Sequence, residues 1–301
     1  MDIHGGFRFF KTMKFTQSFD TLISDPIRAR LPDRIAEVVV FSLKQGWACL
    51  FGILLLLAVI CTNAIWADSW PIARYDFLVV FAVLTQAAML LFRLETWQEA
   101  KVIALFHLTG TSMEFFKVSA GSWSYPEAGF LMILGVPLFS GFMYASVGSY
   151  IARVIRLFDM RFTPYPAFWM TVVLAIAIYV NFFAHHFVPD IRLILFAATI
   201  ALFWRTRITF TLGRCYAIPL PLAALCASFC LWIAENVGTL TGTWVYAGSR
   251  TFEMTSLSKM GSWYLLIYVA FVTVTLVVRA PLGVRRNHAK SKTSQMPPQQ
   301  G

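Results

Sequence analysis

Long runs of apolar residues alternate with short polar segments along most of the chain, and this pattern predicts membrane-spanning helices. A helix needs about 20 predominantly apolar residues to cross the hydrocarbon core of a bilayer. Eight segments approach this length, although the third carries polar residues and the sixth is short: Trp47–Trp66, Phe77–Phe92, Ala100–Val118, Phe130–Ile151, Pro166–Phe183, Ile191–Trp204, Pro219–Ala234 and Trp263–Val278. We therefore predict an all-α polytopic membrane protein with about eight transmembrane helices.

The composition supports the membrane assignment. Hydrophobic residues make up 58% of the chain and charged residues 13%, whereas soluble domains contain roughly a quarter charged residues and under half apolar ones. The first apolar run is long enough to span and has no Ala-x-Ala-like cleavage site, so we expect no cleaved signal peptide. The five cysteines lie in or beside apolar segments and are interpreted as packing residues rather than redox or metal groups.

The net charge of +10 does not indicate nucleic acid, because the basic residues follow the positive-inside rule. With eight spans and an inside N-terminus, all but five of the 25 Lys and Arg residues fall on the inner side; the exceptions are Arg74, Lys117, Arg192, Arg250 and Lys259. We predict that both termini lie on the inner side and that the lipid bilayer, not nucleic acid, is the partner.

Four regions are predicted. Residues 1–35 form a basic N-terminal segment, either a helix lying on the inner leaflet or a basic tail. Residues 36–160 and 161–280 form two four-helix repeats, and residues 281–301 form a disordered basic tail.

The repeats are inferred from a motif that occurs twice, Glu-x6-Gly-(Ser/Thr)-Trp-x-Tyr. The copies lie 121 residues apart, and their members are Glu114, Gly121, Ser122, Trp123 and Tyr125, then Glu235, Gly242, Thr243, Trp244 and Tyr246. Four predicted helices separate the copies, so orientation across the membrane is preserved. The halves would then be parallel repeats related by an axis along the membrane normal, sharing one site. Coincidence is the alternative.

Other polar groups gather near the predicted outer ends of the helices. Ionisable groups at membrane depth cost about 2.5–3.5 kcal/mol each on insertion scales, so they usually face the bundle interior and mark functional sites. His107, Thr111, Glu114 and Lys117 share one helix face. We predict catalytic roles for Glu114, Glu235, His107 and His185. Substrate-binding roles are predicted for Trp123, Tyr125, Trp244, Tyr246, Asn181, Asn236, Lys117 and Lys259.

Structural roles are the alternative for each group. Glu114 can form an ion pair with Lys117, and Glu235 with Lys259. The four motif aromatics can belong to an interfacial belt, and His107 can form a hydrogen bond across helices. The segment 135–141, with its Gly and Pro residues, indicates a kink or a close contact within the fourth predicted helix.

The sequence names no cofactor. His185, His186 and Asp190 have donor types that suit zinc or iron, with His107 as a further donor. Adjacent histidines on a helix point about 100° apart, and no metal-binding spacing occurs. We therefore assign no metal site and keep these residues as candidates only.

Several runs resemble the YoaT-like family of bacterial integral membrane proteins, which is described as a domain of unknown function. They include residues 107–117, 121–127, 135–144, 181–186 and 232–236, and the resemblance covers about residues 36–280. It implies a multi-pass protein of the bacterial inner membrane and supplies no activity.

A looser resemblance links the first motif copy to membrane carotenoid hydratases of the bisanhydrobacterioruberin type. The matching positions are Glu114, Gly121, Trp123, Tyr125, Val136 and Pro137. The hydratases have a Pro-Phe-Gly element before the tyrosine, where this chain has Ser-Trp-Ser. The resemblance implies chemistry on an isoprenoid.

The leading hypothesis is an intramembrane enzyme that acts on an isoprenoid or another lipid by acid-base catalysis. A buried glutamate would protonate a double bond or a leaving group, and Trp and Tyr faces would stabilise the developing cation. A metal-dependent membrane hydrolase is one alternative, and a small-solute or proton-coupled transporter is another. A non-catalytic scaffold is a third.

Overall fold

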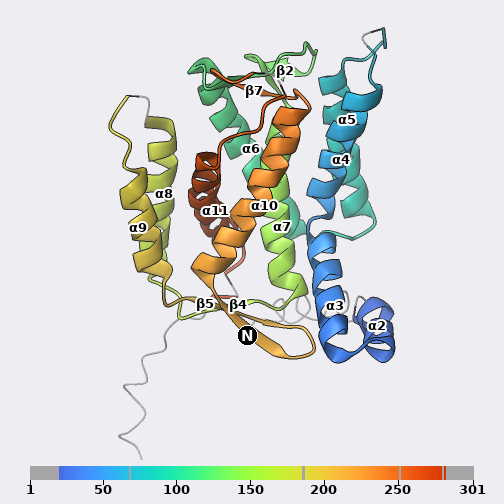
Figure 1. The fold of residues 1–301 in the computed structure, drawn as a ribbon, viewed down its shortest axis with the longest axis vertical. Helices are drawn as coiled ribbons and strands as arrows, with labels where there is room; N and C mark the ends of the chain where they lie inside the picture. The colour runs from blue at the N-terminus through green and yellow to red at the C-terminus, as the bar shows by residue number, and fades with distance from the viewer. Residues whose placement is uncertain (1–19, 68, 185–186, 251, 280, 283–301) are drawn as a thin grey trace, which may run out of the picture.

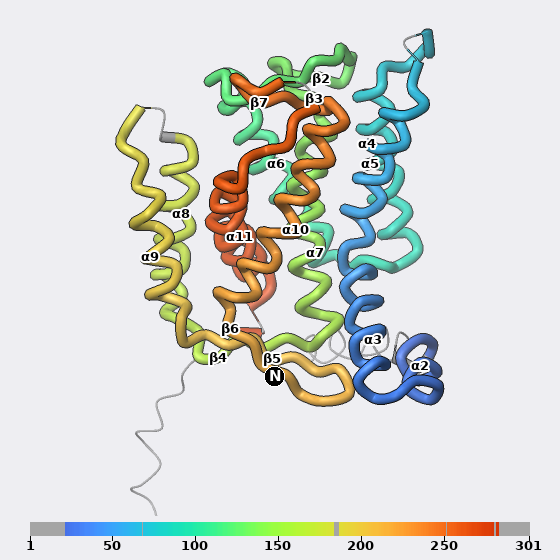
Figure 2. Tube along the Cα trace, viewed as in Figure 1, coloured from blue at the N-terminus to red at the C-terminus, as the bar shows by residue number. Residues whose placement is uncertain are grey.

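The computed structural model describes residues 20–67, 69–184, 187–250, 252–279 and 281–282, and these are mostly helical (Figures 1 and 2). The chain enters through a π-helical turn, η1 (Asp20–Ser24), and the short helix α2 (Asp25–Arg30). The remaining helices are α3 (Asp33–Ala48), α4 (Leu50–Ile65), α5 (Arg74–Leu91), α6 (Trp97–Ser119), α7 (Phe139–Leu157), α8 (Phe168–Ala184), α9 (Arg192–Phe203), α10 (Leu220–Leu240) and α11 (Ser258–Val277). Each of the eight predicted apolar segments overlaps one of the helices α4 to α11.

Length and hydropathy single out fewer spans than the sequence predicts. Within the described ranges, α5, α10 and α11 are long and apolar enough to cross a membrane, and α3 with α4 makes a fourth if the 70° bend between them is a break in one span. Helices α8 and α9 are apolar but shorter. The fold therefore contains three or four candidate spans, and the full set of eight remains a prediction.

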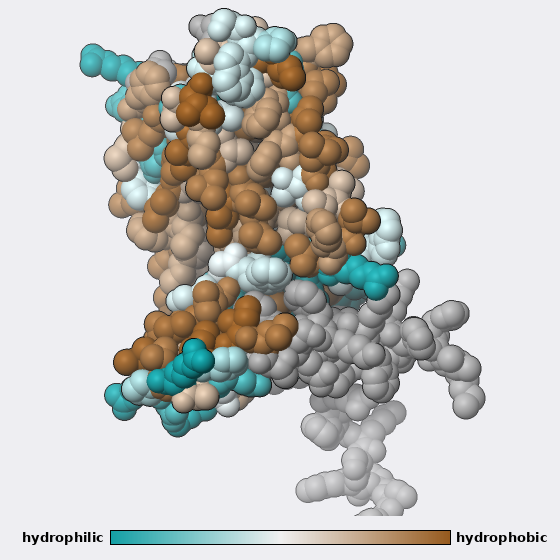
Figure 3. Space-filling view, turned by 90° about the vertical axis from the view of Figure 1, so that its right-hand side faces the viewer, coloured by the Kyte–Doolittle hydropathy of each residue, from teal (hydrophilic) through white to brown (hydrophobic). Residues whose placement is uncertain are grey.

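The helices form a central group with a helical pair on either side. Figures 1 and 2 show α6, α7, α10 and α11 in the middle, α4 and α5 on one side, and α8 and α9 on the other. The largest apolar core lies among the central helices and α8, and includes Phe106, Ile178 and Tyr268. Apolar side chains cover much of the face that Figure 3 shows, and exposed large apolar residues occur on α5, α8 and α9, among them Leu84, Val173 and Leu193. An apolar exterior of this kind suits a lipid environment.

Short strands close both ends of the bundle. Strand β1 (Trp123–Ser124) pairs with β7 (Val245–Tyr246) at one end, which we call the motif end. At the opposite end, the sheet end, β4 (Arg161–Thr163), β5 (Arg207–Thr211) and β6 (Cys215–Pro219) form an antiparallel sheet. The all-α prediction did not include any of these strands.

The predicted helix Phe130–Ile151 is wrong over residues 130–138. A hairpin of β2 (Met132–Ile133) and β3 (Val136–Pro137) occupies it, so α7 begins only at Phe139. Leu134 and Gly135 form the two-residue turn with φ of 50° and 76°, the positive values that tight hairpins need. Gly135 is therefore not at a helix kink. Gly141 does allow a close helix contact, because a Cβ there would lie 2.3 Å from Thr111 Oγ1 of α6.

Candidate functional site

The spacing within the motif follows from how its helix ends. Gly121 and Gly242 have φ of 68° and 63° and stand just beyond the last helical turn, where glycine adopts the left-handed conformation without a Cβ penalty. In both copies the next residue donates its amide to a carbonyl five residues earlier, Ser122 to Lys117 and Thr243 to Gly238. This hydrogen bond and the one from the glycine itself form a Schellman cap, which turns the chain back over the helix end.

The reversed chain brings the motif aromatics to the glutamates. The carboxylate of Glu114 accepts hydrogen bonds from Trp123 Nε1 and Tyr125 Oη, both at 2.8 Å. Glu235 accepts from Trp244 Nε1 at 2.9 Å and from Tyr246 Oη at 2.6 Å. Residues two apart in an extended segment point to the same side, which explains why the motif reads Trp-x-Tyr. The two copies therefore build the same local arrangement.

The two copies also contact each other directly. In the antiparallel β1–β7 pair, Ser124 lies opposite Val245 and Trp123 lies opposite Tyr246. The ring centroids of Trp123 and Tyr246 are 5.7 Å apart in an edge-to-face arrangement. The Glu114 and Glu235 side chains are close enough to interact electrostatically. The sequence prediction of one shared site thus corresponds to a single cluster in space.

The motif tyrosines remain hydrogen-bond donors. Burial, together with the neighbouring Glu114 carboxylate, holds the pKa of Tyr125 well above its ordinary value. Burial and Glu235 do the same for the pKa of Tyr246. Both hydroxyls therefore keep their protons, which suits groups that hold a carboxylate in position.

Tyr144 of α7 is a third donor to Glu114, and the site prediction did not include it. Its hydroxyl lies 2.7 Å from Glu114 Oε1, and its side chain packs against Gly110 of α6, where an added Cβ would lie only 2.6 Å from Tyr144 Cβ. No motif marks this residue in the sequence, because it approaches the glutamate from a different helix. Glu114 thus holds three neutral donors.

The two predicted lysines contact aromatic rings. The Lys117 ammonium lies 4.3 Å from the centroid of the Phe182 ring, and the Lys259 ammonium lies 3.5 Å from that of Tyr246. Lys259 and Glu235 interact electrostatically. The alternative drawn from the sequence was that each glutamate forms an ion pair with a lysine. In the structure, hydrogen bonds to the two glutamates come from Trp and Tyr side chains.

An apolar cavity of about 250 Å³ lies directly beneath this cluster. Helices α6, α7, α8 and α11 supply most of its walls, and its lining includes Met113, Tyr144, Leu231 and Trp263. Tyr144 therefore belongs to both features: its ring lines the cavity and its hydroxyl binds Glu114.

The charged residues stand at the motif end of the cavity. Residues four apart on a helix share a face and are separated by about 6 Å along the axis. Each charged residue stands four positions beyond a lining residue, toward the motif end: Glu114 after Gly110, Lys117 after Met113, Glu235 after Leu231, and Lys259 before Trp263. The cavity thus has apolar walls, and the charged residues stand one helical turn beyond its lining, on the side of the motif end.

His107 lies deeper on the same face of α6. Seven residues, about 10 Å of helix rise, separate it from Glu114. The centroids of the His107 and Phe142 rings are 4.4 Å apart. His107 Nδ1, Thr111 Oγ1 and Ser140 Oγ are buried and have no hydrogen-bond partner among the described residues. The predicted relay role of His107 stays a prediction, since no direct bond joins it to Glu114.

The two predicted asparagines form hydrogen bonds to loop residues. Asn181 donates to the Asp190 carboxylate and accepts from the amide of Ile191, both at 3.1 Å. Asn236 accepts from the amide of Thr255 at 2.7 Å. Asp190 also binds Arg192 at 2.7 Å. Although burial opposes it, hydrogen bonds from Asn181 and Arg192 lower the pKa of Asp190. These contacts favour structural roles.

The metal candidates gain no support. The described ranges contain no group of three or more His, Cys, Asp or Glu residues that could hold a metal ion. His185 and His186 lie outside the described residues, and the Asp190 carboxylate is used by Asn181 and Arg192.

Residues at the start of α5 form hydrogen bonds and an ion pair with the loops that follow α6 and α10. These α5 residues were not among the predicted site residues. Arg74 is 4% exposed and bonds Thr243 Oγ1 at 3.0 Å as well as pairing with Glu127. Tyr75 donates to the Thr243 carbonyl at 2.7 Å, and Asp76 accepts from the amide of Leu131 at 2.7 Å. Together they fix to α5 the second motif copy, through Thr243, and the segment that follows the first copy, through Glu127 and Leu131.

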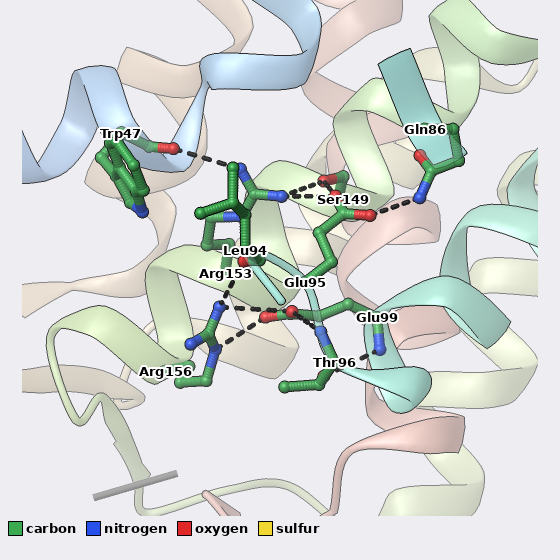
Figure 4. Close-up of polar contacts among 9 residues, drawn as sticks. All are labelled: Trp47, Gln86, Leu94, Glu95, Thr96, Glu99, Ser149, Arg153 and Arg156. Carbon is green, nitrogen blue, oxygen red and sulfur yellow. Dashed lines mark hydrogen bonds and ion pairs between the residues drawn. The ribbon is translucent and has the colours of Figure 1, made fainter. Parts of the chain in front are cut away.

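A second buried polar cluster lies at the other end of α6 (Figure 4). Glu95 accepts hydrogen bonds from Gln86, Ser149 and Arg153, and the Glu95–Arg153 pair has no exposed side-chain surface. Arg153 also donates to the carbonyl of Trp47, beside the bend between α3 and α4. The cluster therefore joins the α5–α6 loop, α7 and the bend.

An adjoining ion pair strengthens the same region. Arg156 binds Glu99 at 2.8 Å, and Glu99 forms a capping box with Thr96 at the start of α6. Arg153 and Arg156, which the topology prediction counted as inner-side charges, are thus largely engaged in buried pairs.

The fold and site define a mostly helical protein with membrane-compatible helices, and the comparisons place it in a family. The chain belongs to the family described as "Protein of unknown function (DUF817)", whose model matches residues 37–271. It is similar to "Uncharacterized protein YoaT" of Bacillus subtilis (strain 168), with 44% identity over 242 residues that cover 80% of this chain and 91% of the relative. No solved structure matches.

The predicted family membership is therefore confirmed. The looser resemblance to carotenoid hydratases is not shown by these comparisons and stays a prediction.

Proposed function

We propose that this protein is an eight-span protein of the bacterial cell membrane, with the motif end on the outer side and both termini inside. The uneven distribution of Lys and Arg supports this orientation. The short apolar helices α8 and α9 would complete the second half of the bundle.

Two parallel four-helix repeats, α4–α7 and α8–α11, are part of the same proposal. A two-fold axis along the membrane normal would make β1 and β7 antiparallel, with Ser124 opposite its own counterpart Val245, and this is the observed register. The flanking pairs α4–α5 and α8–α9 on opposite sides in Figure 1 fit the same axis. The repeat explains why each half supplies one glutamate to the cluster.

The proposed activity is acid-base catalysis on an isoprenoid or another lipid. One observation carries it: the apolar cavity is lined one helical turn from each of the two glutamates, and Tyr144 touches both the cavity and Glu114. Such a cavity would seat an apolar chain with its reactive end at the carboxylates.

The chemistry needs no oxidant or reductant. A proton passes from Glu235 to a double bond or a leaving group of the substrate, which leaves Glu235 ionised and the substrate cationic. The faces of Trp and Tyr rings stabilise the cation. Glu114, held as a carboxylate by three donors, then accepts a proton through the Tyr144 hydroxyl from the cation or from water that adds to it, so that charge balances.

The test compares lipid and pigment profiles of a deletion strain that carries the wild-type, Glu114→Gln or Glu235→Gln protein. We expect both variants to give the profile of the deletion strain. Glu253→Gln is the matched control, since Glu253 is an exposed acid that accepts a hydrogen bond from the amide of Arg250. Wild-type profiles with both variants would contradict the proposal.

A transporter is the second candidate, because of the break between α3 and α4 beside the buried Glu95–Arg153 pair. Broken helices and buried charges often form transporter sites. Saturable solute uptake into proteoliposomes that is lost in Glu114→Gln would favour transport over catalysis.

A further inference from the structure

The cavity beneath the motif cluster reaches the outside of the bundle between α6 and α8. Thr109 of α6 and Ile176 of α8 both line the cavity, and both are exposed, Ile176 to 57%. Each stands near the middle of its helix, so in the proposed topology both lie at the depth of the hydrocarbon core. The opening between them therefore faces lipid chains.

The cavity has about the length of one lipid chain. On α11 its lining extends from Trp263 to Leu276, which is about 20 Å along a helix axis. One leaflet of the hydrocarbon core is about 15 Å thick, half of the thickness of the whole core. The lining consists mainly of apolar side chains. An extended apolar chain would therefore fill the cavity along α11.

The motif end of the cavity is covered by protein. Strands β1 and β7 pair across the loops that follow α6 and α10, and the Trp and Tyr side chains of these loops bind the Glu114 and Glu235 carboxylates. Tyr144 then separates Glu114 from the cavity. A lipid that arrived from water would have to pass all of these groups, whereas a lipid from the bilayer meets only the edges of α6 and α8.

One hydrogen bond joins the two sides of the opening. The hydroxyl of Tyr179 of α8 donates to the backbone carbonyl of Thr109 of α6 at 3.1 Å, and both residues line the cavity. A carbonyl oxygen accepts two hydrogen bonds, so this bond does not compete with the backbone bonds of α6. Rotation of the Tyr179 side chain breaks the bond without a change in the backbone of either helix.

We propose that a membrane lipid enters the cavity sideways from the bilayer, between α6 and α8, and that Tyr179 closes this entry through its bond to Thr109. The inference rests on the proposed function, because it concerns the same cavity, and it narrows the class of substrate. A lipid with a charged head would bring its charge to hydrocarbon depth, which is costly. The entry therefore favours a neutral isoprenoid or another uncharged apolar chain.

The test is photolabelling of the full-length protein in phosphatidylcholine vesicles. One probe is hexadecane that carries a diazirine and dissolves in the bilayer, and the other is a short, water-soluble alcohol with the same diazirine. Peptide mass spectrometry measures the labelling rate at Met113 and Ile267, which line the cavity and are buried. Leu84, exposed on α5, is the reference for insertion in the bilayer. We expect the bilayer probe to label both cavity residues much faster than the water-soluble probe does.

Two variants should change the cavity labelling in opposite directions. Tyr179→Phe removes the closing bond and should raise the rate about threefold, and by roughly twentyfold at most, the factors that correspond to measured interhelical hydrogen bonds in membranes. Ile176→Trp places a large ring in the opening and should lower the rate. Labelling of Leu84 should be the same in both variants as in wild type.

Each variant has a matched control. Tyr150→Phe removes another hydroxyl hydrogen bond of 3.1 Å, to Gln45, at a residue outside the cavity lining. Val173→Trp adds the same large ring to the exposed surface of α8, also outside the lining. Both controls should label as wild type does.

Two results would overturn the inference. The first is equal labelling of the cavity residues by the two probes, which would indicate entry from water. The second is an unchanged rate in both Tyr179→Phe and Ile176→Trp, which would place the entry elsewhere.

The proposed activity can fail separately. If the cavity labels from the bilayer as expected while Glu114→Gln and Glu235→Gln leave the cellular lipid profile unchanged, the cavity takes up lipid without acid-base chemistry.

Discussion

Tyr144 is the side chain through which the Glu114 carboxylate reaches the cavity. Its hydroxyl donates to Glu114 at 2.7 Å, and its ring lines the apolar walls. Trp123 and Tyr125 approach the same carboxylate from the motif loop. With three donors around it, the carboxylate is fixed in one position, as a positioned acid-base group requires.

The contribution of the Tyr144–Glu114 hydrogen bond to stability depends on whether Glu114 is ionised. If Glu114 is ionised, Tyr144→Phe should lower the free energy of unfolding by about 1.5–3 kcal/mol, the range for hydrogen bonds to charged groups. Tyr179→Phe is the control, since Tyr179 donates to the neutral carbonyl of Thr109 at 3.1 Å and its loss should cost only about 0.5–1.5 kcal/mol. Chemical denaturation in detergent measures both, and equal costs would contradict an ionised Glu114.

At the scale of the elements, the Schellman caps fix the separation between glutamate and aromatics. Gly121 stands at φ of 68°, and a left-handed conformation costs other residues about 1–2 kcal/mol. We expect Gly121→Ala and Gly242→Ala each to destabilise the protein by about that amount. Gly46→Ala in α3, where a Cβ meets nothing within 4 Å, should be neutral or stabilising by up to about 1 kcal/mol. Thermal unfolding that ranks the three variants alike would contradict the assignment.

The Glu95–Arg153 pair is the second element-scale constraint, because it joins three segments of the bundle (Figure 4). Arg153→Met leaves Glu95 buried without its counter-charge, and removal of one partner of a buried pair costs about 3–5 kcal/mol. The double variant Glu95→Leu with Arg153→Met should recover part of this loss. A single variant as stable as wild type by denaturant unfolding would contradict the role.

The sequence predicted the elements that have a strong local signal. The eight apolar segments each overlap a helix, and the repeated spacing in the motif identified side chains that do meet in space. Tyr144 and Arg74 were missed because they reach the site from other helices, and no local pattern marks such contacts.

The strands show a different limit. Strand β5 alternates buried Ile208 and Phe210 with more exposed neighbours, a period-two signal that is present but short. The β2–β3 hairpin replaced the start of a predicted helix because Leu134 and Gly135 both adopt positive φ, which an apolar run does not indicate.

At the scale of the whole molecule, the proposed topology puts the motif end outside and the sheet end inside. Ser249 is exposed near β7, and Arg214 is exposed in the turn between β5 and β6. In a background without the five native cysteines, a membrane-impermeant thiol reagent should label Ser249→Cys in intact cells and Arg214→Cys only after lysis. Labelling of Arg214→Cys in intact cells would contradict this orientation.

The cavity beneath the two glutamates should hold a lipid, and native mass spectrometry of the protein in mild detergent detects such a lipid as added mass. The wild-type protein should carry one lipid mass, and Ala270→Phe, which fills the cavity wall, should lose it. Ala87→Phe on the exposed side of α5 should keep it. A lipid mass retained by Ala270→Phe, or a bare protein mass for wild type, would contradict lipid binding in this cavity.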